Sequence, residues 1–376
     1  MRKLSLFAAA SLFAVPFMSS VSSADDSGKV YYDNGTKLET KDFDLKINFE
    51  MQPKFSYTDF DGGDDVTSFS TNAMKVIFSG NVLNKQFSFK VESDFAKDNG
   101  GSSQRDAWIQ WNCSENMANA RLGQFKIPLS RQENASSAAL MFTGKSLVGN
   151  YFAPARQTGA MIHGDVSEGV HYYLGTYNGD STGEGLNRSG QDNKLAVFAA
   201  VHANVGDYGS RAFEGDLRKD TSSTAFTMGV AGIYSENNAV TVTDTTSVTE
   251  KFSWFTLNGD VGMRSGGLDV QSEIYYDNIN FDADGTDSAD DWGFYAQAGY
   301  LLEPQWLIGG RFGYLAPDET LDDRDTVSEY SLVVDYLVNG HNLKLQNQVT
   351  FEDSEYNDGS DNTTDFRYEF QIAGYF

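Results

Sequence analysis

The stretch from residue 121 to residue 156 concentrates basic side chains in a chain that is otherwise strongly acidic. Its basic residues are Arg121, Lys126, Arg131, Lys145 and Arg156, and they are accompanied by a single acidic residue, Glu133. The whole chain has 28 basic and 53 acidic residues and a formal net charge of −25. Because a local excess of lysine and arginine attracts anions by Coulomb interaction, these five basic residues are candidate anion-binding residues.

The residues that most often carry catalysis are not placed in a catalytic pattern. The four histidines, His163, His171, His202 and His341, fall in predicted strands or turns without a G-x-S-x-G or H-E-x-x-H motif. An enzyme needs a nucleophile and a base held together. The sequence therefore predicts no catalytic residue, no metal site and no cofactor.

The end of the chain shows the strand pattern of the elements that must position the basic stretch. From Phe366 to Phe376 apolar and polar residues alternate, with Tyr368 and Phe370 on one face and Arg367 and Glu369 on the other. Successive side chains of a strand point to opposite faces. Such a strand separates an apolar side from a charged side, as the wall of an outer-membrane barrel does.

The same alternation recurs along the chain and predicts about sixteen strands. The expected segments are 43–57, 70–82, 86–96, 104–112, 119–127, 156–164, 169–177, 194–204, 224–236, 250–264, 267–279, 290–301, 306–315, 326–338, 342–352 and 363–376. The predicted fold is all-β, a transmembrane antiparallel up-and-down β-barrel. Short and long connections alternate between the segments, except that 205–223 is too long for the short turn expected there.

The N-terminus predicts export. Met1-Arg2-Lys3 is basic, residues 4–18 are apolar, and Ser22 and Ala24 suit cleavage after Ala24. We expect a signal peptide at 1–24 and a single barrel domain at 25–376, located in the bacterial outer membrane. Without Arg2 and Lys3, 26 basic residues face 53 acidic ones, a net charge of −27, which excludes nucleic acid as a partner.

The longest connection, residues 128–155, differs from the other loops. It carries the apolar residues Leu140, Met141, Phe142, Leu147, Val148, Tyr151 and Phe152. A long loop with an apolar side is expected to bury that side against another part of the protein. In a barrel the surface available for this is the inner wall. We expect this third outer loop to fold inward and to constrict the channel.

Two motifs around this loop resemble the phosphate-selective porin O and P family. Residues 120–131, ARLGQFKIPLSR, are similar to its LGQFK-P-F stretch, and residues 153–159, APARQTG, to its P-x-R-x-x-G. The resemblance implies a trimeric porin of sixteen strands that lets small hydrophilic solutes, above all anions such as phosphate, diffuse passively. The expected partners are outer-membrane lipid, lipopolysaccharide and, through Phe376, the barrel-assembly machinery.

Two alternatives remain open at this stage. The five basic residues could pair with carboxylates on the wall, which would leave a weakly selective pore. The chain could also be a structural or adhesive barrel whose acidic loops, such as 59–65 and 282–291, bind divalent cations.

Overall fold

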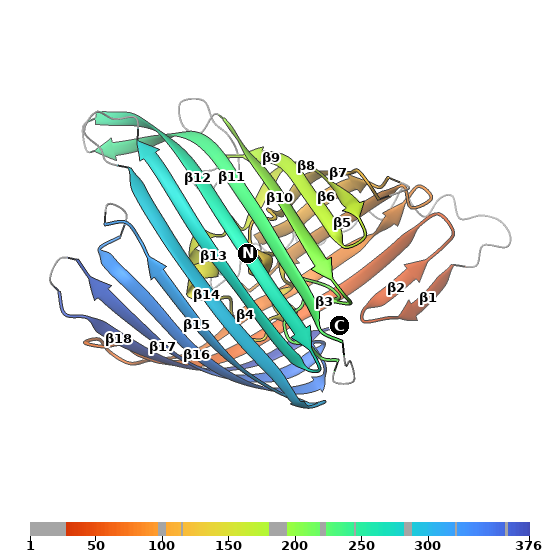
Figure 1. The fold of residues 1–376 in the computed structure, drawn as a ribbon. Helices are drawn as coiled ribbons and strands as arrows, with labels where there is room; N and C mark the ends of the chain where they lie inside the picture. The colour runs from red at the N-terminus through yellow and green to blue at the C-terminus, as the bar shows by residue number, and fades with distance from the viewer. Residues whose placement is uncertain are drawn as a thin grey trace, which may run out of the picture.

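Sixteen antiparallel strands close into a barrel, as predicted. A computed structural model describes residues 28–96, 103–113, 116–179, 194–218, 223–243, 246–281, 288–319, 322–357 and 360–376. The barrel strands are β3 (Asp44–Asp59), β4 (Val66–Val82), β5 (Phe87–Asp94), β6 (Ser103–Trp111), β7 (Asn119–Lys126), β8 (Arg156–Ser167), β9 (Val170–Asn178), β10 (Leu195–Val205), β11 (Ala225–Thr243), β12 (Thr246–Ser265), β13 (Leu268–Phe281), β14 (Ala289–Glu303), β15 (Trp306–Ala316), β16 (Arg324–Asn339), β17 (Leu343–Tyr356) and β18 (Thr363–Tyr375). Each pairs with its sequence neighbour, and the strands are steeply tilted (Figure 1).

The barrel closes where its last strand meets its first. Strand β18 pairs with β17 on one side and with β3 on the other, from Phe366 opposite Asp59 to Tyr375 opposite Glu50. Beyond Tyr375, the backbones of Phe376 and Phe49 exchange two hydrogen bonds of 2.9 Å. Closure leaves no unpaired edge between β3 and β18, which is what a lipid environment requires.

Two short strands were not predicted. Strands β1 (Lys29–Tyr32) and β2 (Thr36–Glu39) form a hairpin, and β2 pairs with residues 44–47 of β3. This part of β3 extends past the end of β18, so the hairpin covers backbone groups that β18 does not reach. The expected signal peptide and its cleavage site lie outside the described residues.

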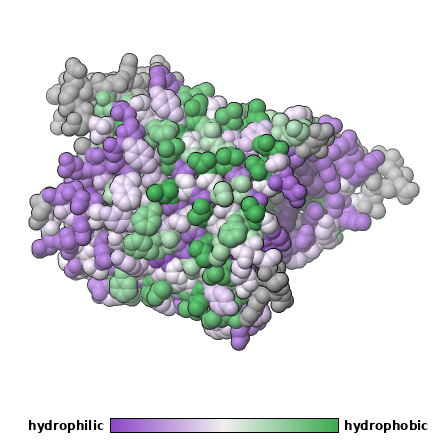
Figure 2. Space-filling view, in the orientation of Figure 1, coloured by the Kyte–Doolittle hydropathy of each residue, from purple (hydrophilic) through white to green (hydrophobic). Residues whose placement is uncertain are grey.

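The strands separate an apolar outer face from a polar inner face. In β16, Leu332 is 64% exposed while its neighbours Ser331 and Val333 are each 2% exposed. Apolar side chains gather in a broad area over the outside of the strands (Figure 2). We call the opposite face, which carries buried residues such as Glu273, Gln348 and Glu369, the polar face.

Several connections differ from the expected ones. The predicted loop 236–249 is wrong, because β11 continues to Thr243 and β12 begins at Thr246. The acidic stretch at 282–287 lies outside the described residues. Within the described ranges no helix is long and apolar enough to cross a membrane, and no group of three or more His, Cys, Asp or Glu side chains is arranged to hold a metal ion.

Candidate functional site

The connection between β7 and β8, which we call the long connection (residues 127–155), contains three short helical turns. They are α2 (Arg131–Asn134), η1 (Ser137–Ala139) and α3 (Leu147–Phe152). The hydroxyls of Ser130 and Ser146 cap α2 and α3 by accepting hydrogen bonds from the backbone N–H groups of Glu133 and Gly149. Serine at these positions fixes where each turn begins.

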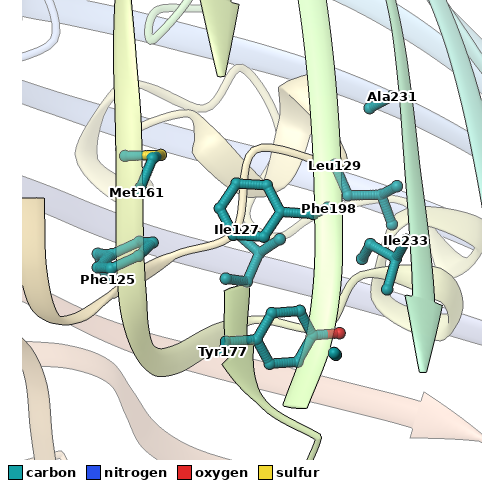
Figure 3. Close-up of a cluster of buried hydrophobic side chains, with 9 residues drawn as sticks. Phe125, Ile127, Leu129, Met161, Tyr177, Phe198, Ala231 and Ile233 are labelled. Atoms are coloured by element: carbon teal, nitrogen blue, oxygen red, sulfur yellow. The ribbon is translucent and has the colours of Figure 1, made fainter. Parts of the chain in front are cut away.

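Apolar side chains attach the long connection to three separate parts of the wall. Ile127 and Leu129 pack with Phe125, Met161 and Phe198, as Figure 3 shows. Further along, two more clusters form with side chains of β13 to β16; the first contains Met141, Phe142, Leu301, Leu307, Val333 and Leu337, and the second Val148, Phe152, Tyr275, Tyr295, Leu315 and Val327. Most apolar residues of the connection are therefore buried against strands, as their composition predicts, whereas Tyr151 is 37% exposed.

Hydrogen bonds to polar-face side chains fix the same connection between these clusters. The Glu273 carboxylate accepts from the backbone N–H groups of Arg131 and Gln132 at 2.9 and 2.7 Å. On other strands, Gln348 accepts from the N–H of Thr143 at 2.9 Å, and Glu329 accepts from the N–H of Leu147 at 2.6 Å. The buried backbone groups thus find partners, which offsets the cost of removing them from water.

Three cavities lie beside the long connection. The first, of about 430 Å³, is bounded by residues 128–131 and by strands β7 to β12. The second, of about 290 Å³, is bounded by residues 134–137 and strands β3 to β8. The third, of about 510 Å³, lies along residues 143–147 and is bounded by β15 to β18 and by β3 and β4. Arg121, Lys126, Asn134 and Ala212 line both the first and the second cavity, and Ser137 lines both the second and the third.

The structure divides the five candidate anion-binding residues into three groups. Arg121 and Lys126, both on β7, have no carboxylate within 4.0 Å among the described residues. The Arg121 guanidinium lies 4.1 Å from the centre of the Trp108 ring and donates two hydrogen bonds to Gln110 Oε1, at 3.0 and 2.7 Å. The Lys126 ammonium donates to the backbone carbonyls of Glu133 and Ala135 at 2.6 and 2.7 Å. Both partners are neutral groups, so among the described residues neither of these two side chains is paired with a carboxylate.

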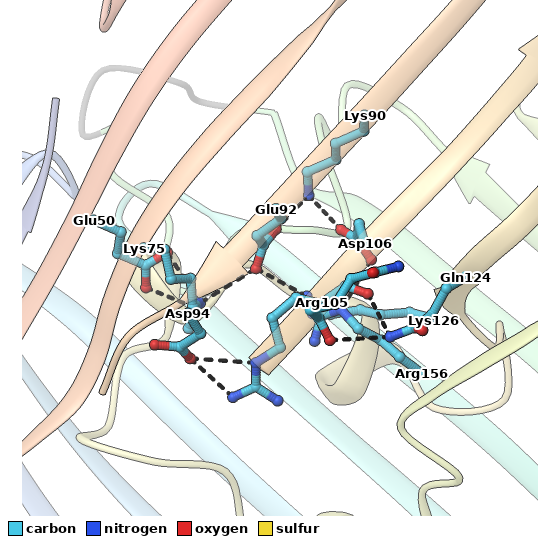
Figure 4. A network of polar contacts seen from close by, with 12 residues as sticks. Glu50, Lys75, Lys90, Glu92, Asp94, Arg105, Asp106, Gln124, Lys126 and Arg156 are labelled. Carbon is cyan, nitrogen blue, oxygen red and sulfur yellow. Dashed lines mark hydrogen bonds and ion pairs between the residues drawn. The ribbon is translucent and has the colours of Figure 1, made fainter. Parts of the chain in front are cut away.

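Arg156 and Lys145 are paired with carboxylates. Arg156 donates to Asp106 at 2.9 Å and to Glu92 at 3.2 Å. Figure 4 shows that Lys75 and Lys90 reach the same carboxylates, Lys75 reaching Glu92 and Lys90 both of them, so that the charges compensate one another.

Lys145 pairs with Glu133 of its own connection. Burial lowers the pKa of Lys145 to about 8, and the nearby positive charges of Arg156, Arg105 and Lys75 act in the same direction. The Glu133 carboxylate opposes them by favouring the charged form.

Arg131 is buried, with only 4% of its surface exposed. Its guanidinium donates to the Tyr208 hydroxyl and lies over the Tyr208 ring, 5.3 Å from its centre. This side chain lines the first cavity, and its main contact is with a segment far away in the sequence.

Sequence reasoning missed Arg211 and Ala212 as residues of the cavities, and it missed which polar-face residues pair with one another. Lys75, Lys90, Glu92 and Asp106 come from strands whose alternation places them on the polar face, but their mutual pairing depends on strand register. Arg211 and Ala212 lie in the connection 205–223, whose excess length was the available indication. The excess length of this connection does not change the strand count, because β10 and β11 pair directly and the count of sixteen stands.

A closed sixteen-stranded barrel with an apolar exterior and charged cavities inside defines an outer-membrane porin. The chain belongs to the phosphate-selective porin O and P family, whose model matches residues 45–373. No curated protein matches the sequence.

Solved structures of similar fold are outer-membrane proteins of low sequence identity. The DcaP channel of Acinetobacter baumannii is 13% identical with a TM-score of 0.65, over 89% of this chain and 98% of that one. An anion-selective porin from Comamonas acidovorans is 11% identical with a TM-score of 0.60, and the trimer form of OmpT of Vibrio cholerae is 12% identical with a TM-score of 0.60. Each of these two matches covers 88% of this chain and 99% of the other.

Proposed function

We propose that this porin favours small anions such as phosphate, and that the long connection narrows its pore. The observation that carries the proposal is the sign of charge around the three cavities. The first cavity is lined by four cationic side chains, Arg121, Lys126, Arg131 and Arg211, against the single carboxylate of Asp260. The second has five cationic residues against three carboxylates, and the third four against three. Every one of these cavities is thus net positive in a chain whose overall charge is −25.

The physical reason for selectivity is the short distance between wall and solute. Two unit charges 4 Å apart interact by about 1 kcal/mol even in bulk water, and by more where water is partly excluded. The acidic outer loops act over a screening length of only ~8 Å at physiological salt. Charges at the narrowest part therefore decide which ion passes. We propose that Arg121 and Lys126, which lack a carboxylate partner among the described residues, act there.

The pairing observed for Arg156 and Lys145 restricts their contribution. Glu92, Asp106 and Glu133 compensate their charges. The alternative interpretation of the sequence, in which the basic residues pair with carboxylates, therefore applies to these two residues. We propose that Arg121 and Lys126 carry most of the anion preference, that Arg131 supports it from its buried position, and that the other two mainly hold the wall and the long connection in place.

The direct experiment is a planar-bilayer measurement of the reversal potential across a potassium chloride gradient. We expect the sign that corresponds to chloride permeating faster than potassium. A potassium preference in the wild-type protein would overturn the proposal. If millimolar phosphate blocks the chloride current, the anion preference includes phosphate.

We further propose that the protein is a homotrimer, exported with cleavage after Ala24, that contacts lipopolysaccharide and is recognised through Phe376 by the barrel-assembly machinery. The trimer form of OmpT supports the homotrimer. The position of Phe376, which is 46% exposed at the end of the barrel, supports its recognition by the machinery. Light scattering of the detergent-solubilised protein tests the trimer, and mass spectrometry of the mature N-terminus tests the cleavage. We also propose that the protein has no catalytic activity, because the family and the fold are those of a channel.

A further inference from the structure

The connection between β10 and β11 lies at the end of the barrel where neighbouring strands are otherwise joined by short turns. Residues 266–267 join β12 to β13 and residues 304–305 join β14 to β15, whereas nineteen positions separate Val205 from Ala225. A two-residue turn would suffice, because Val205 is paired with Phe226. The additional chain therefore serves another purpose. We call its described part, residues 206–218, the crossing segment.

The crossing segment is bound to the long connection, which comes from the opposite end of the barrel. The N–H of Ser136 donates to the carbonyl of Ala212 at 2.9 Å, and the N–H of Glu214 donates to the carbonyl of Ala139 at 2.9 Å. The Glu214 carboxylate accepts from the N–H of Met141 at 2.8 Å. Two backbone hydrogen bonds and a charge-assisted one join the two connections directly.

The crossing segment also contacts the wall, first beside its own strands and then far from them. Arg264 of β12 donates to the carbonyls of Tyr208 and Ser210 at 2.8 and 3.1 Å. The Phe213 ring stacks on His341, in the turn between β16 and β17, with ring centres 5.9 Å apart. Leu217 packs against the cluster that contains Leu301 and Leu307. A segment that starts between β10 and β11 and ends beside β14 to β17 passes across this end of the barrel.

The central residues of the crossing segment are as well buried as those of a domain core. Tyr208, Glu214 and Asp216 are 1%, 2% and 1% exposed. The Glu214 carboxylate accepts from Gln271 at 2.8 Å and from Gln132 at 3.1 Å, in addition to the N–H of Met141. A carboxylate satisfied by three donors is a fixed part of the structure.

We propose that the crossing segment is a second constriction element, which limits the pore from the end opposite to the long connection and sets the size of the solutes that pass. Ala212 lines both the first and the second cavity, and Gly209, Ser210 and Arg211 line the first. A solute that moves between these cavities therefore passes the crossing segment. Arg211 adds a positive charge that is held by Asp260 at 2.7 Å. The inference rests on the porin architecture and is independent of the anion preference.

The first experiment removes the crossing segment. In this variant residues 206–225 are replaced by Asn-Gly, a two-residue turn that matches the twist of paired strands. Since conductance follows the open cross-section of the narrowest part, we expect single-channel conductance to rise by about twofold or more. Uncharged sugars that the wild type excludes should enter liposomes. A folded variant with wild-type conductance and wild-type size exclusion would overturn the proposal.

The second experiment leaves the segment in place, so that it is informative even if the deletion does not fold. Ala212→Cys in a Cys113→Ser background is treated with a bulky thiol reagent, with Gln305→Cys in a short turn as the matched control. We expect reagent at position 212 to reduce the current by about half or more, since it fills the passage, and reagent at position 305 to leave it unchanged. Equal responses at the two positions would contradict the proposal.

Discussion

Reversing the charge of Arg121 is the sharpest single perturbation of the proposed anion preference. Arg121 lines both the first and the second cavity, and its contacts with Trp108 and Gln110 involve side chains only. Unlike Lys126, it does not bind the backbone of the long connection. Its replacement therefore changes the charge of the passage without releasing the loop.

The magnitude follows from the charges that line the cavities. Arg121→Glu removes two charge units from each cavity, which takes the first from a net +3 to +1 and the second from +2 to 0. For an anion that passes at 4–8 Å, two charge units are worth about 1–2 kcal/mol in water. This energy corresponds to a change of roughly five- to thirtyfold in the partition of the anion into the pore. Arg121→Gln, which removes one unit, should produce about half of this free-energy change.

The assay is the reversal potential across a potassium chloride gradient, measured for the wild type, Arg121→Gln and Arg121→Glu in the same lipid. We expect a stepwise shift toward potassium permeability in that order. Lys85→Glu is the matched control, because Lys85 is in the turn between β4 and β5, half exposed, and lines none of the three cavities. Equal potentials for the wild type and Arg121→Glu, or an equal shift for Lys85→Glu, would refute the reasoning.

Three further predictions concern the partners of the basic residues and the anchoring of the long connection. Asp106→Asn removes a carboxylate that pairs with Lys90 and Arg156, so the reversal potential should move toward stronger chloride preference; a move toward potassium would contradict the proposed role of the pairs. Glu273→Gln weakens two hydrogen bonds to the start of α2, each worth about 1.5–3 kcal/mol when the acceptor is charged, and should make the long connection susceptible to protease while the barrel stays folded. Unchanged protection would show that the apolar clusters suffice. Because burial lowers the pKa of Lys145 to about 8, raising the pH from 7 to 9 removes its positive charge and should reduce chloride preference in the wild type but not in Lys145→Met. An equal pH response of the two proteins would assign the effect to another group.

The fold was largely predictable because a barrel wall obeys a simple rule. Each strand faces lipid on one side and polar surroundings on the other, so alternation marks the strands, and β18 matches the predicted segment closely. The extension of β11 and β12 beyond residue 236 was missed, because this part of the two strands is predominantly polar. The β1 and β2 hairpin was missed because its strands have four residues each, too few to show a period.

The site was predictable only in outline. Local charge singled out Arg121 and Lys126, which line two of the cavities, but it could not separate them from Arg156, whose partners are Glu92 on β5 and Asp106 on β6. Such pairs depend on register and side-chain reach across strands. The contact of Arg131 with Tyr208 joins positions 77 residues apart, and no local pattern connects them.

The central claim is that the passage holds anions, and heavy ions can test it directly. A crystal of the protein soaked in bromide should show anomalous density in the first or second cavity, within contact distance of Arg121 or Lys126. A parallel soak in rubidium should leave these cavities without density. Rubidium in the cavities, with bromide confined to the outside of the barrel, would contradict the account.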